Sequence, residues 1–260
     1  MTSTANTPLI ELKNVGKSYG NIIALQGIDL RVGAGEVTCV LGDNGAGKST
    51  LIKIMAGLHQ QSEGELLVDG EATTFASPKQ AVDLGIATVY QDLAVVSLMP
   101  VWRNFFLGRE LTKGRILATL DTHAMRARTI EELRKMGIDL PDVDAPIGSL
   151  SGGQRQCVAI ARAIFFGARV LILDEPTAAL GVKQSGIVLR YISAARDRGL
   201  GVVFITHNPH HAYLVGDRFV LLNRGRQTLD CAREDISLED LTKEMAGGNE
   251  LATLSDELRR

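Results

Sequence analysis

A glycine-rich loop at Gly42–Ser49 has the residue types and the spacing that bind a nucleotide phosphate. Its letters, G-D-N-G-A-G-K-S, fit the pattern G-x-x-x-x-G-K-[ST]. In such a loop, backbone N–H groups turn toward the phosphate, and the positive end of the following helix adds to the attraction. Lys48 is expected to bridge the β- and γ-phosphates, and the Ser49 hydroxyl to hold Mg²⁺. The predicted nucleotide contacts of the loop are Gly42, Asp43, Asn44, Gly45, Ala46, Gly47, Lys48, Ser49 and Thr50.

Two adjacent acids, Asp174 and Glu175, follow the apolar run Val170–Leu173. A buried strand that ends in an aspartate places a carboxylate at the edge of the sheet, where it can hold Mg²⁺ through water. Glu175 comes one residue later, where it could orient and deprotonate an attacking water molecule. A strand can also end in acids that are merely exposed, and the phosphate loop upstream is what favours the catalytic interpretation.

A third motif, Leu150-Ser151-Gly152-Gly153-Gln154, precedes a predicted helix over Arg155–Phe166. A serine and two glycines at a helix start offer N–H groups and a hydroxyl to an anion. The motif therefore predicts a second phosphate-binding site, which makes sense if it serves the ATP of another subunit. The phosphate loop alone leaves kinases and GTPases open, but a P-loop kinase does not explain this motif.

The chain around these motifs alternates short apolar runs with helical periodicity. Strands that alternate with helices imply a parallel sheet with helices on its faces. The segment from Asp92 to about Gly167 differs, and we interpret it as a mostly helical insertion. Predicted strands are Leu9–Val15, Ile22–Leu25, Ile28–Val32, Val37–Leu41, Gly64–Gly70, Ile86–Tyr90, Val170–Leu173 and Gly201–Ile205, with a turn at Lys17–Gly20. Predicted helices are Lys48–Leu58, Ser77–Gly85, Asp121–Met136, Arg155–Phe166 and Lys183–Arg198. In Asp121–Met136, the apolar residues Met125, Ile130, Leu133 and Met136 fall on one face.

Length, charge and cysteine content limit the class of function. The 260 residues carry a formal net charge of -2, so the chain lacks the basic footprint of a nucleic-acid-binding protein. The three cysteines (Cys39, Cys157 and Cys231) lie far apart and are predicted to be reduced and buried, as in a cytosolic protein. Met1–Pro8 is polar, so no signal peptide is predicted. No apolar run approaches the roughly 20 residues that span a bilayer, so action at a membrane requires docking on a protein that spans it.

The three motifs, in this order along the chain, resemble the ABC ATPase family, and the resemblance covers nearly the whole sequence. It implies an α/β fold: a P-loop NTPase (RecA-like) core with a parallel sheet, an N-terminal antiparallel β subdomain and a helical insertion subdomain. It also implies a single ABC ATPase domain over 1–260. Within it, 9–91 and 168–246 form the nucleotide-binding core with the β subdomain, 92–167 forms the helical subdomain with the signature motif, and 247–260 is a tail.

The resemblance implies roles for three single residues. Tyr19 stands where an aromatic side chain stacks on adenine, Gln91 where a glutamine contacts Mg²⁺, and His207 where a histidine contacts the γ-phosphate. Taken alone, each has a plainer interpretation: packing for Tyr19, a surface polar group for Gln91 and a hydrogen bond at a helix start for His207. The implied cofactors are ATP and Mg²⁺. The implied catalytic residues are Lys48, Glu175 and His207, and the implied metal ligands are Ser49, Gln91 and Asp174.

The family's architecture implies a head-to-tail dimer with two-fold symmetry, in which each ATP lies between the Lys48 loop of one subunit and the Ser151 loop of the other. Hydrolysis would be an in-line attack by water, with charge held by Mg²⁺, Lys48 and His207. ATP binding would close the dimer, and hydrolysis would reopen it. One departure is Gly181, which stands where many members carry an aspartate. It is expected to weaken signalling between the two ATP sites without abolishing hydrolysis.

A closer resemblance is to the ATPases of bacterial monosaccharide importers of the ribose, xylose and fructose type. It rests on Gly85–Asp92, Met99–Asn104, Ala178–Val182 and Met245–Gly248. It implies a second ATPase subunit (identical or different), an integral membrane permease and, indirectly, a periplasmic or extracellular sugar-binding protein, with no nucleic acid. The chain would then lie at the cytoplasmic face of the cell membrane. The cargo itself never touches this subunit.

Several alternatives stay open. Trp102, Phe105 and Phe106 lie in a region that the family uses to dock the permease, but they could equally fill the core of the insertion. A soluble ABC ATPase of translation or DNA maintenance would resemble tandem domains or heads on a long coiled coil, and neither a second domain nor sustained heptads occur here. A nucleotide-gated module with weak hydrolysis is the interpretation that Gly181 motivates.

Overall fold

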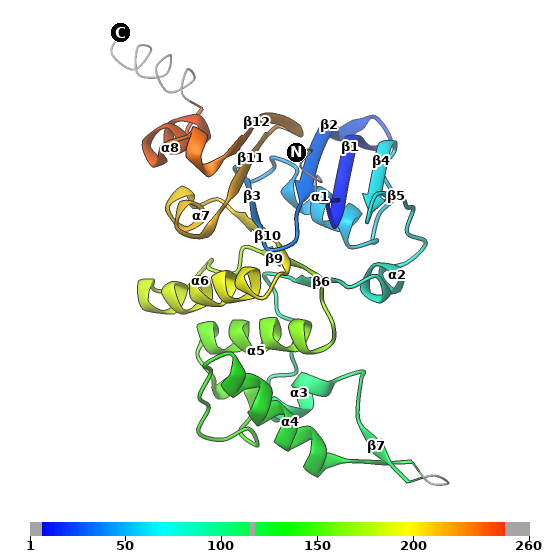
Figure 1. The fold of residues 1–260 in the computed structure, drawn as a ribbon, viewed down its shortest axis with the longest axis vertical. Helices are drawn as coiled ribbons and strands as arrows, with labels where there is room; N and C mark the ends of the chain where they lie inside the picture. The colour runs from blue at the N-terminus through cyan, green and yellow to red at the C-terminus, as the bar shows by residue number, and fades with distance from the viewer. Residues whose placement is uncertain (1–6, 115–117, 248–260) are drawn as a thin grey trace, which may run out of the picture.

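The computed structural model describes residues 7–114 and 118–247. The molecule is elongated, with a sheet at one end and the helices α3 and α4 at the other (Figure 1). Two regions of the sequence predictions lie largely outside the described residues. They are the polar stretch Met1–Pro8, of which residues 1–6 are not described, and the predicted tail at 247–260, of which only Gly247 is described. Gly248, the last residue of the stretch Met245–Gly248, therefore also lies outside. No helix in the two described ranges has both the length and the apolar character that a membrane crossing needs.

Within the described residues, five parallel strands form one half of a sheet of 10 strands, with β6 (Ile86–Val89) at its edge. They lie in the order β11 (Arg218–Asn223), β3 (Val37–Leu41), β10 (Gly201–Thr206), β9 (Val170–Asp174) and β6. Nearly every residue of β3, β9 and β10 is buried, because both faces of a parallel sheet are covered by other elements. The predicted α/β fold with a parallel sheet is confirmed.

The register of these strands brings three loops to one edge of the sheet. Leu41 pairs with Thr206, and Asp174 pairs with Ile205. The chain therefore leaves β3, β10 and β9 at the same level, toward the phosphate loop, His207 and Glu175 respectively. Parallel strands present their carboxyl ends together, and this edge is where ligands bind in open α/β sheets.

The remaining strands are mostly antiparallel and extend the sheet on one side. They are β1 (Ile10–Tyr19), β2 (Ile22–Val32), β4 (Glu63–Val68), β5 (Glu71–Ala72) and β12 (Arg226–Ala232). A single residue pair, Gln26 with Arg226, connects β2 to β12 in the ladder.

The structure corrects the prediction for the first hairpin. The turn predicted at Lys17–Gly20 is strand as far as Tyr19, which pairs with Ile22, and the tight connection keeps only Gly20 and Asn21. The two pieces predicted at Ile22–Leu25 and Ile28–Val32 form one strand, β2. Register shifts in the β1–β2 pairing absorb the irregularities that the sequence pattern presents as breaks.

Helices cover both faces of the sheet. On one face α1 (Lys48–Met55) packs with apolar residues of β2 and Val40 of β3. On the other face Cys39 and Leu41 meet α6 (Val182–Asp197) and α7 (Pro209–Val215). α2 (Pro78–Asp83) precedes β6, and α8 (Leu238–Met245) follows β12 through the short 3₁₀ helix η2 (Arg233–Asp235). The sequence made no prediction for α7, α8, β11 and β12.

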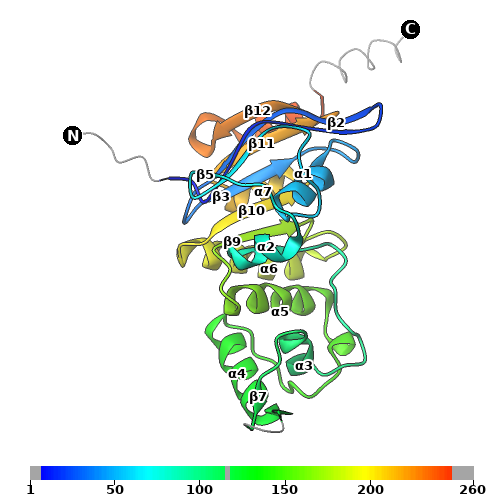
Figure 2. The same ribbon diagram turned by 90° about the vertical axis from the view of Figure 1, so that its right-hand side faces the viewer.

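The insertion between β6 and β9 is mostly helical. Figures 1 and 2 both place α5 (Gly152–Phe165) between α6 and the pair formed by α3 (Val101–Phe106) and α4 (Thr122–Lys135). The sequence did not predict α3, the small hairpin of β7 (Thr112–Lys113) and β8 (Thr119–Leu120), or the 3₁₀ helix η1 (Ile147–Ser149). The predicted apolar face of α4 is buried at Met125, Leu133 and Met136, and Ile130 packs against it half-buried. All three cysteines are unpaired, but Cys231 is only half-buried, which corrects its predicted burial.

Candidate functional site

Two glycines of the phosphate loop occupy positions that a larger residue could not take. Gly42 has φ +148°, and a Cβ there would lie 2.4 Å from the carbonyl oxygen of Leu222. Gly47 has φ +106°, and a Cβ there would lie 2.6 Å from a methyl carbon of Leu25. Glycine tolerates both the positive φ and the close approach. The loop is therefore packed closely between β11 and β2 at these two glycines. Neither close contact could be predicted from the sequence of the loop itself.

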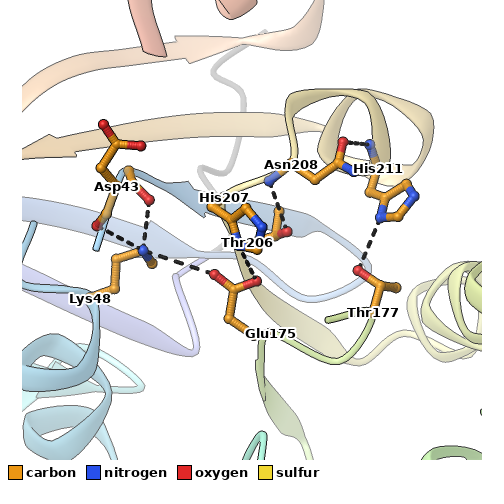
Figure 3. A network of polar contacts seen from close by, with 9 residues as sticks. Asp43, Lys48, Glu175, Thr177, Thr206, His207, Asn208 and His211 are labelled. Carbon is orange, nitrogen blue, oxygen red and sulfur yellow. Dashed lines mark hydrogen bonds and ion pairs between the residues drawn. The ribbon is translucent and has the colours of Figure 1, made fainter. Parts of the chain in front are cut away.

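Lys48 begins α1 and folds back over its own loop (Figure 3). Its Nζ donates hydrogen bonds to the carbonyl oxygens of Gly42 (2.6 Å) and Asp43 (3.0 Å). The same nitrogen lies 3.9 Å from Oε1 of Glu175. The side chain is almost wholly buried, whereas Asp43, Asn44, Gly45 and Ser49 are exposed. A buried ammonium beside an exposed glycine loop is an arrangement that can bind phosphate.

Glu175 connects the phosphate loop to His207. Its Oε2 lies 2.9 Å from Nδ1 of His207, and its backbone N–H donates to the carbonyl of Ile205 (3.0 Å). The φ of Glu175 is +47°, in the left-handed region that non-glycine residues avoid. Such a conformation costs on the order of 1–3 kcal/mol and persists where the surroundings enforce it, as they often do at functional sites. Here the turn aims the carboxylate at both Lys48 and His207 (Figure 3).

Asp174, the last residue of β9, lies in an electrostatic environment that favours a cation. Burial raises the pKa of its carboxyl, the neighbouring Glu175 carboxylate raises it further, and Lys48 lowers it. The two adjacent carboxylates carry more negative charge than the single Lys48 ammonium offsets. Mg²⁺, which prefers carboxylate oxygens, would stabilise their ionised forms. No group of three or more His, Cys, Asp or Glu side chains within 7–114 and 118–247 is arranged to hold a metal on its own.

The other two predicted metal ligands lie on neighbouring elements. Ser49 is exposed in the first turn of α1. Gln91 is exposed two residues after Val89, which pairs with Leu173 at the end of the sheet that carries Asp174. The pKa of Tyr90, the residue before Gln91, is raised mainly by burial, and the Asp174 carboxylate raises it further. The fold thus puts a hydroxyl, an amide and a carboxylate on adjoining elements. Their joint coordination of one ion stays a prediction.

Tyr19 ends β1 and leaves 41% of its surface exposed. The Nζ of Lys17 lies 5.1 Å from the centre of the Tyr19 ring, and the His59 ring meets it edge-on with centres 5.6 Å apart. A half-exposed ring held by two neighbours is compatible with stacking on a base, but its role stays a prediction.

The signature motif forms the start of α5. Ser151 is the N-cap, since its hydroxyl accepts from Gln154 N (3.3 Å) and its own N–H donates to Oε1 of Gln154 (2.9 Å). This reciprocal capping moves the helix start to Gly152, earlier than the predicted Arg155. A Cβ on Gly152 would lie 2.8 Å from a methyl carbon of Leu180, just before α6. Among the described residues, no hydrogen bond of Ser151 or Gln154 reaches the phosphate loop.

The aromatic residues after Met99 form part of the core. Phe105 and Phe106 are fully buried, and Trp102 is 5% exposed, with its Nε1 donating to Asp144 (2.9 Å). Core packing is therefore what these three side chains do. Beside them, a cavity of about 260 Å³ opens between β6, α3 and α5. Its lining is largely apolar, and its only charged residues among those described are Arg109 and Arg162.

Sequence reasoning missed a second contact between the loops that follow β9 and β10. Oγ1 of Thr177 and Nδ1 of His211 share a hydrogen bond of 3.0 Å (Figure 3). The two residues are 34 positions apart, so no local pattern connects them. Only the parallel pairing of β9 with β10 brings them together.

Comparisons with known proteins agree with this geometry. A family model described as "ABC transporter" matches residues 25–178. The xylose/arabinose import ATP-binding protein XylG of Sulfolobus acidocaldarius is 42% identical over 91% of this chain and 93% of that protein. The fructose import ATP-binding protein FrcA of Rhizobium meliloti is 40% identical over 95% and 96%. The ribose import ATP-binding protein RbsA of Lacticaseibacillus paracasei is 37% identical over 92% of this chain but only 47% of that protein.

Solved structures share the fold. A dimeric ATP-binding cassette in a post-hydrolysis state with ADP and Pi superposes with a TM-score of 0.72 and 28% identity, covering 86% of this chain and 98% of that chain. An ATP-binding cassette of an ABC transporter in its ADP conformation gives a TM-score of 0.79 at 21% identity, covering 92% and 95%.

Proposed function

Because this chain belongs to the ABC transporter family, we propose that it hydrolyses ATP to drive a membrane importer of monosaccharides. The observation that carries the proposal is the convergence of Lys48, Glu175 and His207 at one edge of the sheet. The three come from separate elements, and together they supply what phosphoryl transfer to water requires. Lys48 is the cation, Glu175 is the base, and His207 is a second contact for the phosphate.

In the proposed reaction, Lys48 turns from the carbonyls of its own loop to the β- and γ-phosphates of ATP. Glu175 takes a proton from the attacking water, and His207 contacts the γ-phosphate. Both carboxylate oxygens of Glu175 are engaged in the structure, one near Lys48 and one at His207. ATP would draw both partners toward phosphate oxygens and so release Glu175 to act as the base.

Ser49, Gln91 and Asp174 would hold Mg²⁺, which supplies the positive charge that neutralises the β- and γ-phosphate oxygens. The raised pKa of Asp174, caused first by burial and then by Glu175, supports a cation at this place. Tyr19 would stack on adenine, and the exposed residues Asp43 to Gly45 would wrap the phosphates with their N–H groups.

The signature motif is proposed to act across a dimer, on the ATP that the other subunit holds. Within one chain the motif is capped on itself and packs near Leu180, so Ser151 to Gln154 would serve the ATP held by a second subunit. A head-to-tail pair would place each ATP between one Lys48 loop and Ser151 of the partner subunit. A structural relative at 28% identity is a dimer with ADP and Pi. The second subunit would be another copy of this chain.

The largely apolar cavity between β6, α3 and α5 is the proposed docking place of the permease. It starts from the end of β6, next to Gln91, so a segment seated there would be sensitive to the state of the nucleotide site. The chain would then lie peripherally on the cytoplasmic face of the membrane. A sugar-binding protein outside would deliver the cargo to the permease.

Xylose, arabinose, fructose and ribose are the sugars in the names of the three relatives. All four are monosaccharides, which is why this class is proposed. We also propose the division of the chain into a nucleotide-binding core with its β subdomain (9–91 and 168–246), a helical subdomain (92–167) and a tail (247–260).

The test is ATP turnover by the full chain with the membrane protein that co-purifies with it. Wild type should hydrolyse ATP, and the monosaccharide that is transported should stimulate turnover. Glu175→Gln should reduce turnover about 10²–10⁴-fold and trap an ATP-bound dimer. Wild-type turnover no higher than that of Glu175→Gln would indicate a nucleotide-gated module instead. Sugar-independent turnover with no membrane partner would indicate a soluble ATPase.

A further inference from the structure

Two loops meet at the candidate catalytic centre, and two side-chain contacts connect them. The first loop leaves β9 and carries Glu175 and Thr177, and the second leaves β10 and carries His207 and His211. One contact is Glu175 with His207 at 2.9 Å, and the other is Thr177 with His211 at 3.0 Å. In the proposed reaction the first contact is broken, because ATP redirects both of its members. The second contact involves neither of them.

The second contact is built into ordered structure on both sides. Thr177 is 6% exposed and lies in the turn that begins at the strained Glu175. His211 lies in the first turn of α7, where its N–H donates to Oδ1 of the N-cap Asn208 (3.1 Å). Asn208 N in turn donates to Oγ1 of Thr206 (3.1 Å), at the end of β10. The segment 206–211 is therefore held as one unit, with His207 inside it.

The chemistry at His211 suits a fixed bond. Burial lowers the pKa of the His211 ring, and the nearby His210 and His207 rings lower it further. A neutral imidazole has one donor and one acceptor nitrogen, so Nδ1 can pair with a hydroxyl in either tautomer.

We infer that His211, through its hydrogen bond to Thr177, is a positioning residue that keeps Glu175 and His207 in register after ATP has separated them. His211 touches neither phosphate nor water in this scheme. It holds the loop after β10 against the loop after β9, so that base and phosphate contact stay at the spacing needed for in-line attack. The inference rests on the proposed function, since it assigns a role within the same ATP-hydrolysing site.

The test compares matched pairs of variants in the permease complex. Thr177→Val removes the hydroxyl at nearly constant shape, and Thr177→Ser keeps it. His211→Leu removes the ring nitrogen, and His211→Asn keeps a polar atom near the Nδ1 position. His210→Leu, an exposed neighbour on the same helix, is the control. The readouts are kcat and KM for ATP, with the melting temperature recorded for each variant.

Loss of one positioning hydrogen bond, worth about 1 kcal/mol, should lower kcat roughly fivefold. KM for ATP should stay unchanged, and Thr177→Ser and His211→Asn should restore most of kcat. The double variant Thr177→Val/His211→Leu should be no slower than either single variant, because both remove the same bond.

Three results would overturn the inference: Thr177→Val with wild-type kcat, Thr177→Ser as slow as Thr177→Val, or additive losses in the double variant. These outcomes are distinct from failure of the proposed function, in which wild type itself would not hydrolyse ATP above the level of Glu175→Gln.

Discussion

Single residues at the carboxyl edge of the sheet carry charge that the protein balances only in part. Asp174 and Glu175 are adjacent acids, and Lys48 is the ammonium that offsets them. The pKa of Asp174 is raised, because burial and the Glu175 carboxylate disfavour its ionised form more than Lys48 favours it. Keeping Asp174 ionised therefore destabilises the folded protein. A cluster of charges that destabilises the protein without its ligands is typical of a functional site, where activity and stability trade off.

Asp174→Asn should therefore stabilise the nucleotide-free protein at pH 7. Because the folded pKa of Asp174 lies above its unfolded value, ionisation favours unfolding, and the wild type loses stability as pH rises from about 4 through the raised pKa. The variant lacks this loss, so its melting temperature should exceed that of wild type at pH 7, with the gap closing toward pH 4.

Asp139→Asn, which alters an exposed aspartate, is the control for that measurement. Equal melting temperatures of Asp174→Asn and wild type at pH 7 would contradict the prediction. The same variant should lose ATP turnover, since it removes a proposed Mg²⁺ ligand.

At the scale of elements, the start of α5 combines a structural and a functional role in one serine. Ser151 caps the helix and is also proposed to meet the partner's nucleotide. α8 offers a matched case, because Ser237 caps it through Asp240 N (3.1 Å) at a place with no proposed catalytic role.

Ser151→Ala and Ser237→Ala should each cost about 1 kcal/mol of unfolding free energy, as the loss of an N-cap does. Only Ser151→Ala should also reduce ATP turnover and ATP-dependent dimerisation. Denaturant unfolding and steady-state hydrolysis measure the two effects. If both variants kept full turnover, Ser151 would be a cap alone.

The aromatic cluster of the helical insertion gives a second prediction at this scale. Phe105 is fully buried, with its ring centre 5.4 Å from that of Phe106 and 5.5 Å from that of Phe165. Phe105→Ala should destabilise the protein by roughly 3–5 kcal/mol, through lost burial and the cavity left behind. Leu98→Ala, at a residue that is 89% exposed, should change stability little. Comparable melting temperatures for the two variants would contradict the assignment of Phe105 to the core.

The elements also show what a sequence can and cannot predict. Apolar runs bounded by turns, such as Val37–Leu41 and Val170–Leu173, were placed correctly, because burial on both faces leaves a simple signature. The long strands β1 and β2 were cut short, because their register shifts interrupt the alternation. The close contacts at Gly42 and Gly47 and the Thr177–His211 bond arise from pairing between distant segments, which no local pattern encodes.

At the scale of the whole molecule, the cavity between β6, α3 and α5 lies where the helical insertion meets the sheet, and β6 connects it to the carboxyl edge that carries the candidate site. The cavity is lined by apolar residues of α5, including Ala159 and Ala163, and by residues that follow β6, including Leu93 and Val95. A protein segment seated there would contact both the helical insertion and the strand that leads to Gln91. In the proposed function, this connection would couple transport to hydrolysis.

Ala163→Phe should fill the cavity and weaken association with the permease by about tenfold or more, since each 1.4 kcal/mol is a factor of ten. ATP binding by the isolated chain should not change. Ala72→Phe, on the exposed edge strand β5, is the matched control. Association can be measured by co-purification and by stimulation of turnover. Full permease-stimulated turnover in Ala163→Phe would place the docking surface elsewhere.

The single residue pair between β2 and β12 gives the sheet a mechanical weak point. Under a pulling force, strands separate first where the fewest ladder bonds share the load, so β1, β2, β4 and β5 would separate from β12 along this line. Leu25, which approaches Gly47, belongs to β2 and so to the part that separates. A stretched molecule would therefore release bound nucleotide while its parallel strands were still paired. In force spectroscopy, bound nucleotide should raise the force of a first, partial unfolding event that comes before the main rupture.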